Sequence, residues 1–401
     1  MKIKILLGML FSLAAMTVAG CGGGGGGAAT TTVAGTAMKG LFTEGTVQVF
    51  AVDPATGKQA ATPLKTDVLK ADSTFSVDIG SVTGPIIIEV TGKYKDEASG
   101  ATAPPVALTT PMRAAVGNAT GLTTVMVTPL TELAVEKVVN NVFTTTSIDK
   151  ANKDISDAFK LDSIITTKPV DAASVAAKTA AGAERDYGLL LASVSQIMKK
   201  SGGTLSQVLS DLAGGISGST LSLAAATSIK VGQFDFVTSP NNQTTVTIDG
   251  LAANPFNAAN PKIALMKIST TGLPAGKTIG GIDFTMNLPA GVIVSADATT
   301  KEATGGAVTV SGVAVADATS TSISTASFNA PALRVVLANA KGFGGGQFMN
   351  VACTLPAGST VTAAQLQAVV TAATGTATDL TGAPITGVTL TAAGTDNVVI
   401  F

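Results

Sequence analysis

Few residues in this sequence have the types and spacing needed for enzyme chemistry. The chain has no histidine, which excludes Ser-His-Asp and Cys-His mechanisms and histidine-ligated zinc or haem. Two cysteines occur in 401 residues, Cys21 and Cys353. Cys353 shares one face of the alternating segment 349–355 with apolar residues, so we expect it to point into a core as a small hydrophobe. We therefore predict no catalytic residue, metal or cofactor, and interpret the protein as not an enzyme.

Carboxylates are the remaining candidates for acid–base work. Glu184 and Asp186 are two residues apart on a predicted helix, and such residues do not face each other; we interpret them as part of a solvated face with a local ion pair. Asp53, Asp72 and Asp78 lack the spacing of a calcium loop and are predicted to be turn and surface residues. A carboxylate-only polysaccharide hydrolase is the weaker alternative, and it needs two carboxylates about 5 to 10 Å apart.

The first cysteine follows a secretion signal. Residues 1–4 are basic, and residues 5–18 form an apolar run that is shorter than the roughly 20 residues of a membrane span. A basic start, a short apolar stretch and small residues before a cleavage point are typical of a secretory signal peptide. We predict a signal peptide over 1–20.

The residues Val18, Ala19, Gly20 and Cys21 resemble a bacterial lipobox. This resemblance implies cleavage before Cys21 and acylation of the new N-terminal cysteine with fatty acids such as palmitate. Glycines rather than aspartate follow Cys21, which by resemblance to Gram-negative lipoproteins favours the outer membrane. Several acyl chains hold a protein stably on a membrane, so we expect a lipid anchor in the outer membrane, on the cell surface or the periplasmic face. The alternative is an ordinary signal peptide with an incidental cysteine.

Residues 21–34 are predicted to be a lipidated, glycine-rich tether. Gly22 to Gly27 have no side chains to pack and great backbone freedom. A phosphate-binding loop is disfavoured because no strand precedes the run and no Lys-Ser/Thr follows it. The net charge of −1 gives no electrostatic indication of a nucleic-acid partner.

Residues 35–127 predict a β-sandwich. Segment 46–52 is rich in β-branched residues, 75–79 alternates apolar and polar residues, and 86–90 is apolar, as expected for strands. The sequences KGLFTEGTVQVFAVDPATGK, DSTFSVDIG and GPIIIEVTG resemble small carboxypeptidase-regulatory-like and immunoglobulin-like modules of bacterial surface proteins. The resemblance implies a structural module that brings no catalytic residues.

Residues 128–213 predict a helical region. Thr128 and Pro129 suit the N-cap and first position of a helix, and Thr204 begins a capping box. Between them we expect a helix around 148–159, capped by Ser147, and a longer one from about 171 to 200. The sequence VTPLTELA, with Tyr187 and LLLASVSQIM downstream, is similar to a pattern in bacterial cell-surface proteins of unassigned activity.

Residues 214–240 are predicted to be a linker rich in small residues, and 241–401 a second β-sandwich. Segments 282–288 and 333–337 are expected strands, and the glycine-rich loop 342–346 is interpreted as a mobile hairpin connection. The sequences GGIDFTMNLPAGVIV, LRVVLANAKGFGGGQFMNVACTLPAG and DLTGAPITGVTL resemble the cohesin-like and carbohydrate-binding-like sandwich group. True cohesins bind dockerin partners through one sheet face.

These features predict a multidomain, mainly β chain in which a helical region separates two β-sandwich modules. The expected function is a non-enzymatic envelope lipoprotein that presents these modules for adhesion or scaffolding. Its partners would be the membrane, through Cys21, and an unidentified protein or polysaccharide. The alternatives are a cohesin-type assembly module and a carbohydrate-binding surface protein; the absence of tryptophan disfavours an aromatic sugar-binding platform.

Overall fold

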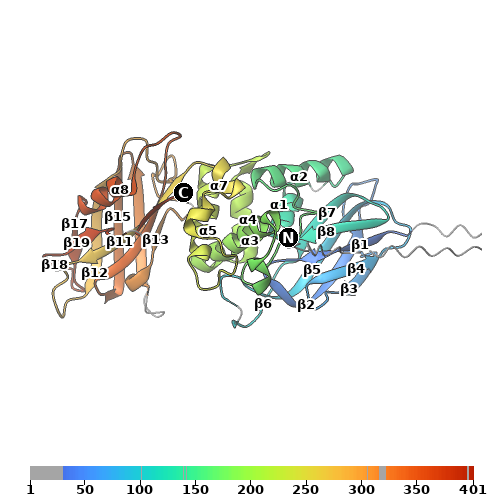
Figure 1. The fold of residues 1–401 in the computed structure, drawn as a ribbon, viewed down its shortest axis with the longest axis horizontal. Coiled ribbons are helices and arrows are strands. Elements are labelled where there is room, and N and C mark those ends of the chain that lie inside the picture. The colour runs from blue at the N-terminus through green and yellow to red at the C-terminus, as the bar shows by residue number, and fades with distance from the viewer. Residues whose placement is uncertain are drawn as a thin grey trace, which may run out of the picture.

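The computed structural model describes residues 30–100, 102–138, 140, 142–304, 306–315, 322–394 and 397–401. Within these ranges the chain is mainly β, with several sheets and eight helices (Figure 1). None of the described helices has the length and apolar character needed to cross a membrane. The predicted signal peptide, and with it Val18, Ala19, Gly20 and Cys21, lies outside the described residues.

Two sheets form the N-terminal β region. The first has the order β4-β1-β8, with β1 (Thr32–Ala37) antiparallel to β4 (Thr74–Asp78) and parallel to β8 (Leu122–Val127). The second has the order β3-β2-β5-β6, with β7 also paired to β5; it comprises β2 (Leu41–Ala51), β3 (Lys65–Val68), β5 (Gly84–Lys95), β6 (Val106–Ala107) and β7 (Met112–Ala119).

Apolar side chains from both sheets, including Phe42, Phe75 and Ile88, form one buried core. The three strand segments expected from the sequence are confirmed. In β4 the alternation is plain, since Phe75 and Val77 are buried while Ser76 and Asp78 are exposed.

Seven helices and a short hairpin follow. They are α1 (Pro129–Glu136), α2 (Thr145–Ala158), α3 (Gly182–Ser201), α4 (Leu205–Gly214), β9 (Ile216–Ser217), β10 (Thr220–Leu221), α5 (Leu223–Val237), α6 (Ile248–Leu251) and α7 (Pro255–Ala259). The predicted caps of α1 and α4 are confirmed, because Thr128 and Thr204 each form a capping box. The predicted cap of α2 is wrong: Thr144 is the N-cap, and Ser147 is the third helical residue that bonds back to it.

The start of α3 also differs from the prediction. The helix begins at Gly182 rather than near 171, and a short 3-10 turn, Val175–Lys178, precedes it. The Asp171 carboxylate accepts a hydrogen bond from the backbone N–H of Ala173. Such a local bond competes with helix formation, so residues 171–181 form turns instead.

Residues 214–240 are not a linker. They contain α5, a helix of 15 residues whose buried side chains surround its axis. A helix without a polar face lies inside the structure. Helix α5 is buried in this way because α3 covers one side of it and the C-terminal β region covers another. Since no polar face remains, its sequence has no amphipathic period to reveal a helix.

The C-terminal β region contains two more sheets. One has the order β13-β16-β11-β19, with β20 also paired to β11, and the other has the order β14-β15-β12-β17-β18. The elements are β11 (Ile263–Thr271), β12 (Ile279–Asn287), β13 (Val308–Val310), β14 (Ser322–Asn329), β15 (Ala332–Phe343), β16 (Gly346–Thr354), α8 (Ala363–Thr371), β17 (Thr374–Thr378), β18 (Pro384–Ile385), β19 (Thr389–Thr391) and β20 (Val398–Ile400).

Strands β12, β15 and β16 include the segments expected from the sequence. The glycine-rich loop 342–346 does lie between strands, but it is not a hairpin connection. It joins β15 of one sheet to β16 of the other. The loop therefore carries the chain across the core that the two sheets share.

Apolar clusters continue across both junctions between regions. On the N-terminal side, Ile87 of β5 and Ala115 of β7 pack with the residues of α1 and α2. On the C-terminal side, Val231 and Phe234 of α5 pack with Leu265 of β11. Figure 1 accordingly shows the helices between the two β regions along the long axis of the molecule.

Candidate functional site

Cys353 lies on β16 in the core of the C-terminal β region and is 0 % exposed. Burial raises the pKa of its thiol to about 12. Because the thiolate is the reactive form of cysteine, this side chain is inert at neutral pH. The prediction that it points into a core is confirmed.

The carboxylates considered in the sequence also occupy structural positions. Asp186 pairs with the neighbouring Arg185, with 3.7 Å between Oδ1 and Nε. Asp53, Asp72 and Asp78 each accept a hydrogen bond from a backbone N–H two residues ahead. The local ion pair and the turn roles are therefore confirmed. The solvated face is not, because Glu184, Arg185 and Asp186 are all half-buried.

A buried cluster of charges, which the sequence did not indicate, lies where the N-terminal β region meets α3. Lys39, between β1 and β2, is 0 % exposed. Its ammonium lies 2.8 Å from Oδ2 of Asp96 and 3.3 Å from Oε2 of Glu97, and it contacts Oγ of Ser195 on α3. The Ser195 hydroxyl donates to Glu97 at 2.5 Å. The cluster therefore joins three segments that are distant in sequence.

A serine beside a lysine raises the question of nucleophilic catalysis. In that chemistry a neutral lysine takes the serine proton. Burial alone lowers the pKa of Lys39, but the carboxylates of Glu97 and Asp96 outweigh it and raise the pKa well above its usual range. Lys39 therefore stays protonated at neutral pH, and Ser195 is fully buried. This arrangement is suited to holding α3 against the β region, not to attacking a substrate.

The VTPLTELA segment also has a structural role. The Thr128 hydroxyl lies 2.7 Å from the hydroxyl of Tyr187, which in turn donates to the carbonyl of Ile164 at 3.1 Å. Glu132 accepts from the backbone N–H and the guanidinium of Arg113 on β7. The VTPLTELA segment and Tyr187 therefore connect α1 to α3 and, through Arg113, to β7 of the second sheet.

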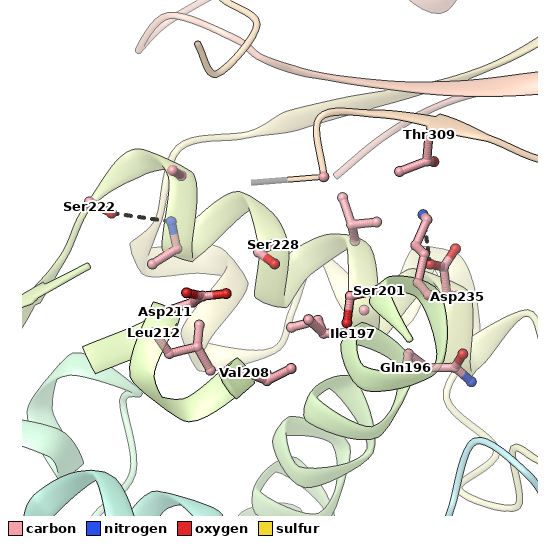
Figure 2. A pocket seen from close by; sticks show the side chains of 16 residues that line it. Gln196, Ile197, Ser201, Val208, Asp211, Leu212, Ser222, Ser228, Asp235 and Thr309 are labelled. Atoms are coloured by element: carbon pink, nitrogen blue, oxygen red, sulfur yellow. Dashed lines mark hydrogen bonds and ion pairs between the residues drawn. The ribbon is translucent and has the colours of Figure 1, made fainter. Parts of the chain in front are cut away.

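A cleft of about 430 Å³ lies among α3, α4, α5 and the β13 segment. Its walls are mostly apolar, and Thr309 of β13 lies across the opening from the helices (Figure 2). Lys200 and Asp235 at the rim pair with each other at 3.2 Å. The buried Oγ1 of Thr309 has no hydrogen-bond partner within the described chain. The cleft therefore offers apolar contact, hydroxyl groups, the Gln196 amide and the charged side chains of Asp211, Lys200 and Asp235.

No group of three or more Cys, Asp or Glu side chains in the described ranges is arranged to hold a metal ion. Comparison with known proteins adds no further assignment: no family model, curated protein or solved structure matches this chain.

Proposed function

We propose that this chain is a non-enzymatic lipoprotein of the bacterial cell envelope, anchored in the outer membrane through acyl chains on Cys21. Its β regions, which we interpret as two sandwich modules separated by the helices, present surfaces to a protein or matrix partner in adhesion or scaffolding. One observation carries the proposal. Ser195, the serine that lies beside Lys39, and Cys353 are both buried, whereas the cleft has mostly apolar walls with hydroxyl groups and the carboxylates of Asp211 and Asp235 among its polar groups.

The direction in which the chain enters the fold supports an N-terminal anchor. Thr32 begins β1 and pairs with Asp78 and Leu122. The other end of β1 leads to Met38, which packs in the core of the helices. A tether attached before Thr32 would hold the N-terminal β region nearest the membrane and leave the C-terminal β region at the far end of the molecule.

A cohesin-type assembly module or a carbohydrate-binding surface protein is the alternative for the C-terminal region. In the sheet β14-β15-β12-β17-β18, the three inner strands carry mainly small and hydroxyl side chains on their solvent side, with an Asp283–Arg334 ion pair among them. This face has no aromatic platform for stacking a sugar, which favours a protein or matrix partner over a glycan.

Metabolic labelling with a palmitate analogue in a Gram-negative host tests the anchor. Wild-type protein and the Cys353→Ala variant should both become labelled and remain in the membrane fraction, while Cys21→Ala should lose both properties. The Cys353→Ala variant is the matched control because it removes the other cysteine. Labelling of Cys21→Ala would refute the lipoprotein assignment. If the wild type is labelled as expected, protease treatment of intact cells decides whether the modules face the outside or the periplasm.

A further inference from the structure

A groove of about 1050 Å³ opens beside the last strand, β20, where the helices meet the C-terminal sheets. Figure 1 places the C-terminal end of the chain at this junction. One wall is β20 itself, and the opposite wall is the segment 242–249, which follows α5. The groove is separate from the cleft at Thr309, with which it shares no lining residue.

The edge of β20 that faces away from β11 has unused hydrogen-bonding groups. Phe401 exchanges two backbone hydrogen bonds with Ile263, and Asn397 accepts one from Lys267. Because bonding alternates along an antiparallel strand, the N–H and C=O groups of Val398 and Ile400 point to the opposite side. Within the described chain no hydrogen bond uses these four groups. A strand edge with unpaired groups can pair with an added strand. Val398 is buried and Ile400 is half-buried, so an added strand would reach this edge through the groove that both residues line.

The opposite wall is held in place before any partner arrives. The Asn242 side chain donates to the carbonyls of Val237 at 3.1 Å and Val246 at 3.0 Å. It also accepts from the backbone N–H of Thr244 at 2.9 Å. A wall that is already ordered costs less conformational entropy when a ligand binds.

The charged side chains that line the groove favour an acidic partner. Lys178 and Lys267 both line it and form no ion pair with a described carboxylate, while Asp249 is the opposing charge. The Lys267 ammonium lies 5.6 Å from the ring centroid of Phe234, which fixes its position. Positive charge next to a free strand edge complements an extended chain that carries carboxylates.

We propose that this groove binds an extended acidic segment of a partner protein, which pairs as an added strand with the outer edge of β20 while its carboxylates face Lys178 and Lys267. The inference rests on the proposed binding function and names its partner class. It does not depend on the lipid anchor.

The test uses full-length protein in detergent and isothermal titration calorimetry. The probe is a six-residue synthetic peptide that alternates glutamate and valine, and its comparison peptide has lysine in place of glutamate. We expect the acidic peptide to bind, with an affinity that falls as salt is added, and the basic peptide not to bind.

Ile400→Pro is the decisive variant. Proline is tolerated at an edge position whose N–H points outward, so the pairing of β20 with β11 should persist while a docking donor is lost. We expect binding about tenfold weaker than in the wild type. The melting temperature should fall somewhat, because Ile400 packs partly against the core, but circular dichroism should show that the fold is retained; Ile400→Val, which keeps the N–H, is the matched control. Lys178→Glu should weaken binding about fivefold or more, and Lys70→Glu, in the N-terminal β region, should leave it unchanged.

Binding of the acidic peptide that survives Ile400→Pro would overturn the proposal, as would equal binding of the basic peptide or no binding up to millimolar concentration. Dimerisation of the wild type that Ile400→Pro abolishes would also overturn it, because the occupant would be a second copy of this chain. Palmitate labelling at Cys21 reports on the anchor separately. If labelling fails while the peptide binds, the lipoprotein assignment falls and the groove assignment stands.

Discussion

Replacing Lys39 with methionine should destabilise the protein far more than the same replacement at the surface. Methionine fills a similar volume but carries no charge. The change would leave Asp96 and Glu97 buried without the ammonium that lies 2.8 and 3.3 Å from their oxygens. Removing one partner of a buried ion pair costs about 3–5 kcal/mol, because the other charge stays in a poorly solvated place.

That loss is a substantial fraction of the usual stability of a domain, about 5–15 kcal/mol. The transition of the N-terminal and helical regions should therefore move to clearly lower denaturant concentration. The protonation state of Lys39 does not complicate the measurement at pH 7. Its pKa is raised, so the stability that its charge contributes is fully present below its ordinary pKa. That contribution is lost only as the pH rises through the raised value.

Urea titration followed by far-ultraviolet circular dichroism gives the free energy of unfolding. The matched control is Lys93→Met. Lys93 also pairs with a carboxylate at 2.8 Å, that of Glu44, but the two side chains are 53 % and 63 % exposed. Water screens a pair this exposed, and it contributes little to stability, so the control should unfold almost like the wild type. Equal effects of the two substitutions would refute the reasoning that burial of the Lys39 cluster determines its contribution.

Three further predictions concern buried groups. In a Cys21→Ala background, Cys353 should not react with a thiol reagent in native buffer but should react in urea, because its pKa is raised to about 12 by burial; rapid native labelling would contradict this. Tyr187→Phe removes the hydroxyl that bonds to Thr128 and Ile164 and should cost about 1–3 kcal/mol of unfolding free energy, and an unchanged urea midpoint would count against the role given to this bond. Burial and the nearby charges of Glu97 and Asp96, partly offset by Lys39, raise the pKa of Asp171 to about 6. Its protonated form therefore favours the folded state, and the stability it contributes should be complete below about pH 4 and lost as the pH rises through 6, by up to about 3 kcal/mol. Asp171→Asn should flatten this part of the stability–pH curve, and an unaltered curve would show that Asp171 does not cause it.

Local features of the fold could be predicted from the sequence because the interactions that create them lie within a few residues. The Thr128 and Thr204 capping boxes each span four residues, and the alternation in β4 follows from successive side chains pointing to opposite faces of a strand. The apolar and polar alternation in the sequence of β16 likewise predicted the buried position of Cys353, although in the structure the second face of this strand, with Ala352 and Thr354, is buried too. The predicted start of α3 was wrong because the Asp171 side chain bonds to the backbone of Ala173. This local bond competes with helix formation, and α3 begins at Gly182 instead of near 171.

Other features depend on packing between distant segments, and the sequence carries no local pattern for them. Helix α5 was missed because packing partners on more than one side removed its polar face. The groove beside β20 exists because β20 pairs with β11, far back along the chain. The Lys39 cluster joins residues up to 156 positions apart. By itself the sequence determined several strands of each β region, the N-caps of α1 and α4, the burial of Cys353 and, as a prediction, the anchor at Cys21. Only the tertiary structure decided which charges became buried and which strand edge stayed open, since both depend on how sheets and helices pack against one another.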